Sequence, residues 1–180
     1  MSFLTCFSDA SLCSRSLACG WGGWAIREEW GRGRFYGGVS MLGARNSNEA
    51  ELVAVLHLLR ALSAEGELAT VSGVMIQSDS IAMLAALMAL VPGAEWRASK
   101  SDLDMADVDV RRTFSPFERR HSQEIANLLY MRFVYVRHVK GHTDNAAGRS
   151  WVNAQCDREA KKHMQFRRKS ASQVRWLDPV

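Results

Sequence analysis

The chain has 180 residues, 47% hydrophobic and 23% charged, which is enough to bury a core without cross-links and favours one soluble globular domain. Its longest apolar stretch, near residues 81–91, is too short for a bilayer span, and the N-terminus does not resemble a signal peptide, so we expect a cytoplasmic protein with no membrane association. The four cysteines lack metal-ligand spacing and are expected to be reduced, while a net charge of +4 and a pI of about 9.1 slightly favour polyanionic partners.

The first predicted strand covers residues 3–9 and ends in a carboxylate, Asp9. Phe3 and Phe7 share one face by the two-residue period, and the opposite face is also apolar. A strand with two apolar faces is covered on both sides and is therefore central in its sheet. Taken alone, Asp9 is more simply explained as a turn former than as a reactive group.

Glycines are clustered at the end of the stretch 10–23, where they would permit a tight turn or close approach of the backbone to a ligand. Residues 24–27 and 34–36 then read as two strands around a turn at 30–33. Together with the first strand they predict an antiparallel meander.

A helix is predicted to begin at Asn48, a good N-cap, and to end near residues 65–66. Glu49 and Glu51 lie in its first turn, where the helix dipole favours acids and where Asn48 and Glu51 have the spacing of a capping box. Both glutamates flank the apolar stripe about equally, so periodicity leaves open which one faces a site. The stripe consists of Leu52, Val55, Leu56, Leu59 and Leu62.

Another strand, predicted over 71–77, is followed by Asp79. Asp79 or Ser80 would cap the next helix, 81–91, and a cap is the simpler explanation for an aspartate there. If this strand is a parallel neighbour of the first, however, Asp9 and Asp79 converge at the sheet edge where open α/β sheets bind ligands.

The composition changes over residues 95–120, where basic residues surround a series of spaced aspartates that read as a solvated face. A helix at about 116–130, a strand at 133–136 and a last helix at about 150–166 follow. The basic segment 167–180 is expected to be a flexible tail.

Five short motifs in this order resemble the type 1 ribonuclease H family. They span roughly residues 3 to 165, and each is individually weak, but their order and separations together are specific. The matching stretches are Phe7-Ser8-Asp9-Ala10-Ser11, Asn48-Glu49-Ala50-Glu51-Leu52, Gln77-Ser78-Asp79-Ser80, Val139-Lys140-Gly141-His142 and Cys156-Asp157-Arg158-Glu159-Ala160.

The resemblance implies an α/β, ribonuclease H-like fold over residues 1–166, with a mixed five-stranded sheet (antiparallel meander plus parallel strands) flanked by helices and an enlarged insertion at about 95–120. It selects Glu51 over Glu49 and implies cleavage of RNA strands that are paired to DNA. The implied site consists of four metal-binding carboxylates and a loop histidine: Asp9, Glu51, Asp79, Asp157 and His142.

Four close carboxylates repel one another and suit hard cations, so the expected cofactor is a pair of Mg²⁺ ions, with Mn²⁺ as a substitute. As the family implies, Asp9 would bridge both ions, with Glu51 and Asp79 on the first and Asp157 on the second. We expect two-metal hydrolysis that leaves a 5′-phosphate and a 3′-hydroxyl, with His142 relaying a proton or aiding product release.

Contacts with an RNA/DNA hybrid are expected from Ser11, Asn48 and Gln77, which adjoin the acids. Bacterial relatives often carry a basic, Trp-containing protrusion after the second helix, and Trp96, Arg97 and Lys100 resemble its start. The aspartates that follow depart from that pattern.

We expect a monomer. Within the same broad fold, a junction resolvase, a transposase-like nuclease or an exonuclease would use similar acids. A nucleic-acid-binding module that has lost catalysis is the alternative from another class.

Overall fold

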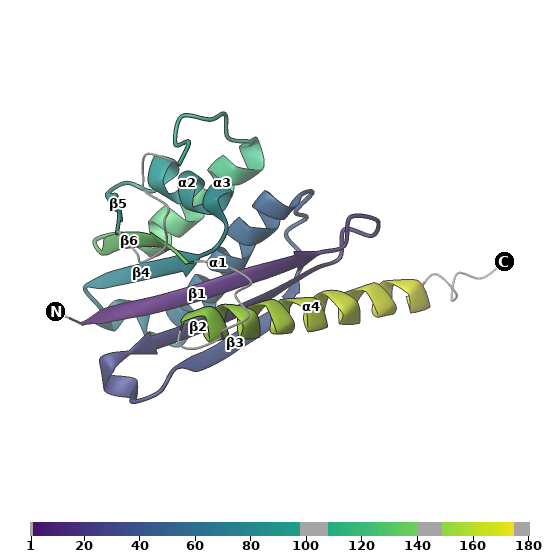
Figure 1. Ribbon diagram of the computed structural model, residues 1–180, viewed down its shortest axis with the longest axis horizontal. Coiled ribbons are helices and arrows are strands. Elements are labelled where there is room, and N and C mark those ends of the chain that lie inside the picture. Colours follow the sequence, from purple (N-terminus) through teal and green to yellow (C-terminus); the bar gives the residue numbers. More distant parts are fainter. Residues whose placement is uncertain (1, 98–107, 140–148, 175–180) are drawn as a thin grey trace.

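The computed structural model describes residues 2–97, 108–139 and 149–174 as a mixed α/β fold (Figure 1). The sheet has the strand order β3-β2-β1-β4-β6-β5. Its strands are β1 (Phe3–Leu12), β2 (Cys19–Arg27), β3 (Arg34–Ser40), β4 (Gly73–Ser78), β5 (Ala94–Trp96) and β6 (Phe133–His138). The helices are α1 (Ser47–Ala64), α2 (Ile81–Leu90), α3 (Pro116–Leu128) and α4 (Arg149–Val174), with 3₁₀ turns η1 (Glu28–Trp30) and η2 (Leu68–Thr70).

β1 is central, as predicted: it is antiparallel to β2 on one side and parallel to β4 on the other. The meander and the parallel strands are confirmed, but the sheet has six strands rather than five. The sixth is β5, whose three residues pair with β6 after a turn in which Gly93 has a φ of 75°. Three residues are too few to show a period, which is why the sequence did not predict this strand.

Helices cover both faces of the sheet (Figure 1): α1, α2 and α3 lie on one face, and α4 crosses the other over β1, β2 and β3. The apolar stripe predicted for α1 is confirmed, since all five of its side chains are buried in the main core. No helix in the described part of the chain is long and apolar enough to cross a bilayer.

Glycines in β2 allow α4 to pack directly on the strand backbone. A Cβ atom at Gly20 would lie 2.2 Å from the carbonyl oxygen of Ala160, and one at Gly22 would lie 2.1 Å from that of Cys156. The prediction of a turn or ligand approach over 10–23 is therefore wrong for these glycines, because β1 and β2 are longer than expected and a helix makes the close approach. Asp9 correspondingly lies inside β1, directly opposite Gly22.

Replacing Gly22 by alanine is expected to lower the free energy of unfolding by about 3 kcal/mol, because the new methyl group meets helix backbone that cannot turn aside. Gly23→Ala is the matched control, since the three atoms nearest to its Cβ all belong to the flexible Leu58 side chain, the first at 3.0 Å. For the control we expect a loss of about 1 kcal/mol in the free energy of unfolding, and urea denaturation would measure both losses. Equal losses would contradict this account of the packing.

The helix ends correct the predicted cap of α1 and decide between the two candidates for that of α2. Asn46, not Asn48, caps α1, and its side chain accepts a hydrogen bond from the backbone N–H of Glu49. Ser80 rather than Asp79 caps α2, through the N–H of Met83. Because Asn46 and Ser80 accept the hydrogen bonds of the first helical N–H groups, neither Glu51 nor Asp79 is needed as a cap. Both acids are therefore available for another purpose.

α4 continues to Val174, eight residues beyond the predicted end at 166. Residues 167–174, expected to belong to a flexible tail, are therefore helical. The stretch from Arg167 to Val174 contains neither Pro nor Gly, so nothing in it interrupts the helix.

Candidate active site

Asp9 and Asp79 are brought together by the parallel pairing of β1 and β4. The last paired residues of these strands are Phe7 and Gln77, and each aspartate follows two positions later. Because adjacent strands lie about 4.8 Å apart, the two carboxylates meet at one edge of the sheet. The predicted convergence of Asp9 and Asp79 rests on this pairing.

Asp157 approaches the same place from α4. Cys156 is fully buried and packs with Phe7 of β1, while its carbonyl group lies against Gly22 opposite Asp9. The missing side chain at Gly22 thus lets the turn of α4 that carries Asp157 come down beside Asp9. Glu51 enters from the first turns of α1, and its carboxyl group lies next to that of Asp9.

Crowding of these acids shifts their pKa values. Burial, followed by the charges of Asp79 and Asp157, raises the pKa of Asp9 to about 6 from its ordinary 3.8. Burial and the charges of Asp9 and Asp79 raise the pKa of Glu51 well above its usual range. The N–H of Ala10, 2.7 Å from Oδ1 of Asp9, offsets only part of this cost.

Two further polar side chains hold the acids in place. Nδ2 of Asn153 donates a 3.0 Å hydrogen bond to Oδ2 of Asp79, and Nζ of Lys161 lies 2.6 Å from Oδ2 of Asp157. Asn153 is 4% exposed, and its Oδ1 is buried without a hydrogen-bond partner. Asn153 was not predicted from the sequence, although its position one helical turn before Asp157 places it on the same side of α4.

The chemistry of these acids fits a divalent cation better than their present contacts do. Oε2 of Glu51 is buried without a partner among carboxylates that repel it, which is the situation that a cation with oxygen ligands relieves. Within the described residues, however, no three Asp, Glu, His or Cys side chains are arranged to hold a metal ion. To do so, Asp157 would have to turn from Lys161, whereas Asp79 can keep Oδ2 on Asn153 and offer Oδ1.

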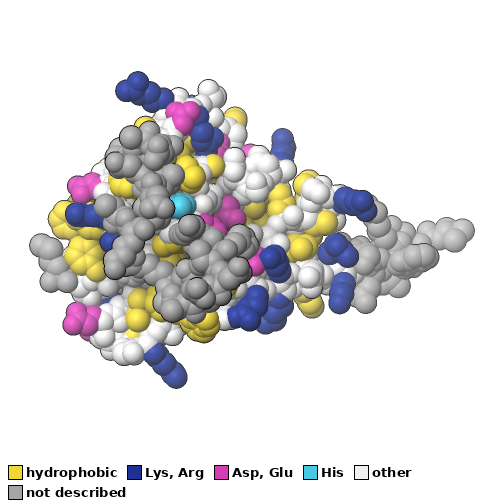
Figure 2. Space-filling model, in the orientation of Figure 1, with side chains coloured by type: hydrophobic (Ala, Val, Ile, Leu, Met, Phe, Trp, Pro, Cys, Tyr) yellow, Lys and Arg dark blue, Asp and Glu magenta, His cyan; other side chains and the backbone are white. Residues whose placement is uncertain are grey.

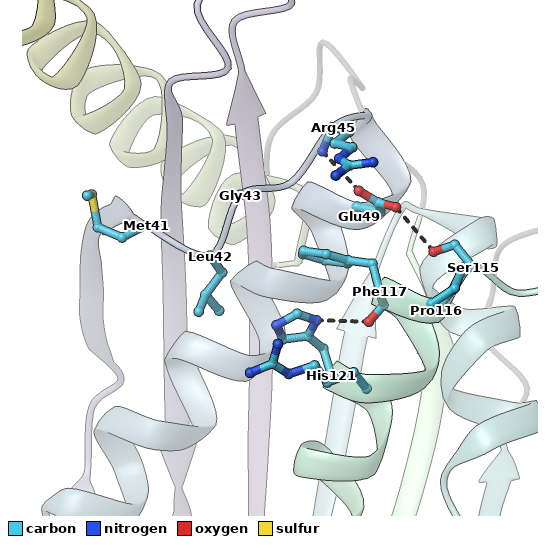
Figure 3. Close-up of a pocket in the computed structure, with 10 residues that line it drawn as sticks. Met41, Leu42, Gly43, Arg45, Glu49, Ser115, Pro116, Phe117 and His121 are labelled. Atoms are coloured by element: carbon cyan, nitrogen blue, oxygen red, sulfur yellow. Dashed lines mark hydrogen bonds between the residues drawn. The ribbon is translucent and has the colours of Figure 1, made fainter.

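Glu49 has a different role from Glu51. The helical pattern alone did not decide which of the two faces the site. Its Oε2 accepts the backbone N–H of Arg45 at 2.9 Å, and its Oε1 accepts the hydroxyl of Ser115 at 3.1 Å (Figure 3). Ser115 also caps α3, so Glu49 joins the starts of α1 and α3. These contacts lie at a pocket of about 700 Å³, which is lined by Glu49 but by none of the four predicted metal ligands.

The residues predicted to contact a hybrid differ in how far they are exposed to solvent. Asn48 is exposed near the start of α1 and Ser11 is half-buried in β1, so their roles stay predictions. Gln77 is only 3% exposed and does not present its amide to a ligand in this conformation. Lys100 and His142 lie outside the described residues.

Trp96 and Arg97 are held by the body of the protein. Trp96 belongs to β5 and packs against the main core, and residues 98–107, which follow Arg97, lie outside the described part of the chain, so the expected protrusion stays a prediction. β5 is three strands from β1, roughly 14 Å at the usual strand spacing. The Arg97 guanidinium lies 3.9 Å from the centre of the Tyr135 ring, and it also pairs with Glu95.

Charged side chains are spread over the face shown in Figure 2, and two groups of them lie next to one another. Acidic side chains gather near the middle of the face shown, and Lys and Arg side chains are distributed beside them along α4. An acidic centre that adjoins a basic surface suits a polyanion whose reacting phosphate needs cations.

The sequence model of one family, described as RNase H, matches residues 2–165. The chain belongs to the RNase H family. The resemblance noted from the five motifs is thereby confirmed. No curated protein matches the sequence.

Solved RNase H structures share the fold. The N-terminal RNase H domain of rv2228c from Mycobacterium tuberculosis, a fusion with maltose binding protein, has a TM-score of 0.63 at 13% identity, covering 95% of this chain and 99% of that one. RNase H1 from the halophilic archaeon Halobacterium salinarum has a TM-score of 0.61 at 16% identity, and the match covers 91% of this chain and 98% of that one. LC11-RNase H1, isolated from compost and solved in complex with RNA/DNA hybrid, has a TM-score of 0.62 at 16% identity, and the match covers 91% of this chain and 97% of that one. At such identities the likeness supports the fold alone.

Proposed function

We propose that this RNase H family member hydrolyses the RNA strand of RNA/DNA hybrids. The observation that carries the proposal is the meeting of four acids from β1, α1, the end of β4 and α4, in a chain of this family. A surface that only bound phosphates would gain nothing from buried, mutually repelling carboxylates. The hybrid bound by LC11-RNase H1, which has the same fold, supports the choice of substrate.

Asp9, Glu51, Asp79 and Asp157 would hold two Mg²⁺ ions, or Mn²⁺ in their place, and bound ions would supply an activated water and stabilisation of the leaving oxygen. Asn153 orients Asp79. Lys161 neutralises the charge of Asp157 as long as that carboxylate holds no cation. His142 would relay a proton or aid product release. No covalent nucleophile is required, and the products would be a 5′-phosphate and a 3′-hydroxyl.

The deciding experiment offers labelled RNA/DNA hybrid, duplex RNA and duplex DNA separately, with Mg²⁺ and then with EDTA. We expect cleavage of the RNA strand of the hybrid alone, only with metal, and 3′ ends that a polymerase can extend. Cleavage of branched DNA would indicate a resolvase, and trimming from one end an exonuclease. Hybrid binding with no cleavage in any metal would indicate a silent binding module.

Asn153→Ala is expected to lower kcat for hybrid cleavage by about 10- to 100-fold with little change in KM, because partners that orient a ligating side chain commonly contribute that much. Asn127→Ala on α3, whose amide oxygen accepts from exposed Gln123, is the control and should be silent. A fall in stability alone, with kcat unchanged, would make Asn153 a purely structural residue.

A further inference from the structure

Residues 157–170 carry the whole net charge of the protein. Six of the 23 Lys and Arg residues and only two of the 19 acids lie there, so this stretch has a formal charge of +4, equal to that of the entire chain. The remaining sequence is neutral. The weak basic bias noted from composition is therefore a local feature of α4.

Four exposed side chains form what we call the α4 basic strip: Arg158, Lys161, Lys162 and Arg168. At about 100° per residue, Lys161 and Arg168 lie within about 40° of Asp157 around the helix axis, hence on the side of α4 that faces the acidic site. Arg158 and Lys162 lie farther round, toward solvent. Figure 2 shows Lys and Arg side chains continuing along α4 from the acidic centre.

The two arginines of the strip are available to a ligand. In the described part of the chain neither Arg158 nor Arg168 makes an ion pair, whereas Lys161 pairs with Asp157 and Lys162 with Glu159. Arg168 lies beside the β1–β2 turn, where, after hydrogen bonds from Ser16 and the backbone, its charge helps lower the pKa of Cys13 to about 7. Exposed Arg15 occupies the same turn and adds a further cation.

We propose that the α4 basic strip binds the sugar–phosphate backbone of the nucleic acid duplex on one side of the cleaved phosphate, a role that rests on the proposed hybrid hydrolysis. Arg168 lies eleven positions after Asp157 in the helix, which is about 16 Å. At about 3.4 Å per nucleotide the strip reaches roughly five base pairs beyond the site. Duplex phosphates match its charge, and the regular helix holds Lys161 and Arg168 in line with Asp157.

Two arginines near the opposite edge of the sheet are held by contacts within the protein. Arg97 at the end of β5 is engaged by Tyr135 and Glu95, and Arg112 is engaged by Glu118 and the carbonyl oxygen of Ala82. Basic residues that hold the protein together are less free to meet phosphates. Unpaired arginines on α4 are better placed for that contact.

The first test measures binding as a function of salt, with the full chain carrying Asp79→Asn so that the hybrid stays intact. Arg168→Gln should reduce the slope of log K against log salt by about 0.9, so that the ratio of affinities at 50 and 200 mM falls about 3.5-fold. The double variant Arg158→Gln, Arg168→Gln should reduce the slope by about twice as much. Arg32→Gln is the matched control, because Arg32 is exposed, makes no ion pair within the described residues and lies in the η1–β3 turn, at the opposite end of β1 from Asp9.

Slopes that are the same for Arg168→Gln and Arg32→Gln would overturn the proposal. So would loss of binding to phosphatidylserine vesicles in Arg168→Gln with hybrid binding unchanged, since the strip would then serve a lipid surface. Because binding is measured without turnover, this result stands apart from the proposed function, which fails if the wild-type chain cuts no hybrid.

The second test uses DNA duplexes with four consecutive ribonucleotides in one strand, so that cleavage is confined to one place. Flanks of 3 or 12 base pairs are attached to either side. Arg168→Gln should lower kcat/KM relative to wild type only when one particular flank is long, because a three-pair flank ends before the strip. A reduction that does not depend on either flank would contradict a contact five base pairs away.

Discussion

Asp79→Asn is expected to reduce hybrid cleavage by at least about 10³-fold while leaving hybrid affinity within about twofold. Asparagine keeps the size of the side chain and an oxygen that can still accept the hydrogen bond from Asn153, so the fold and the position of α4 should be retained. It removes one of the charges that would hold cations, and the loss corresponds to about 4 kcal/mol of transition-state stabilisation.

Single-turnover cleavage of a labelled hybrid and equilibrium binding of the same hybrid, both in Mg²⁺, would measure the two effects. Asp109→Asn is the control, since Asp109 is exposed and, among the described residues, its side chain accepts only the nearby N–H of Arg111. Cleavage at the wild-type rate by Asp79→Asn would remove Asp79 from the site, and the proposed chemistry with it.

Asp9→Asn is expected to stabilise the protein by up to about 3 kcal/mol at pH 7.5 in EDTA. The pKa of Asp9 is raised from 3.8 to about 6, so ionising this carboxylate costs the folded state free energy that the unfolded chain does not lose. For a carboxyl group with a raised folded pKa, this penalty is absent below about pH 4, grows as the pH rises, and is complete above about pH 6. Asparagine removes it.

Urea denaturation at pH 7.5 and at pH 4 would measure the difference, which should vanish at the lower pH. Adding Mg²⁺ at pH 7.5 should stabilise the wild type more than the variant, because a ligand that binds only the folded state raises its stability. If Asp9→Asn is less stable than wild type at pH 7.5 in EDTA, then the acids do not repel one another as described.

Local patterns predicted much of the fold because they report local physics. The alternation around Phe3 and Phe7 predicted a central strand, and the apolar stripe of α1 predicted its buried face, both of which the structure confirms. The same reasoning failed where an element was very short or a residue had an unusual role. β5 has three residues, and the glycines of β2 resemble a turn even though they lie in a strand under α4.

The sequence by itself determined that the chain is an α/β protein of the RNase H family, because order and spacing of the acid motifs survive without coordinates. It also contained the basic stretch from 157 to 170. Only the tertiary structure decided how Glu49 and Glu51 divide their roles, which polar side chain supports Asp79, and on which side the basic stretch faces. Such facts depend on contacts between residues far apart in the chain: Ser115 engages Glu49, Asn153 reaches Asp79, and Gly22 admits the helix that carries Asp157. Periodicity describes which face of an element is apolar, whereas the partner on that face is set by packing.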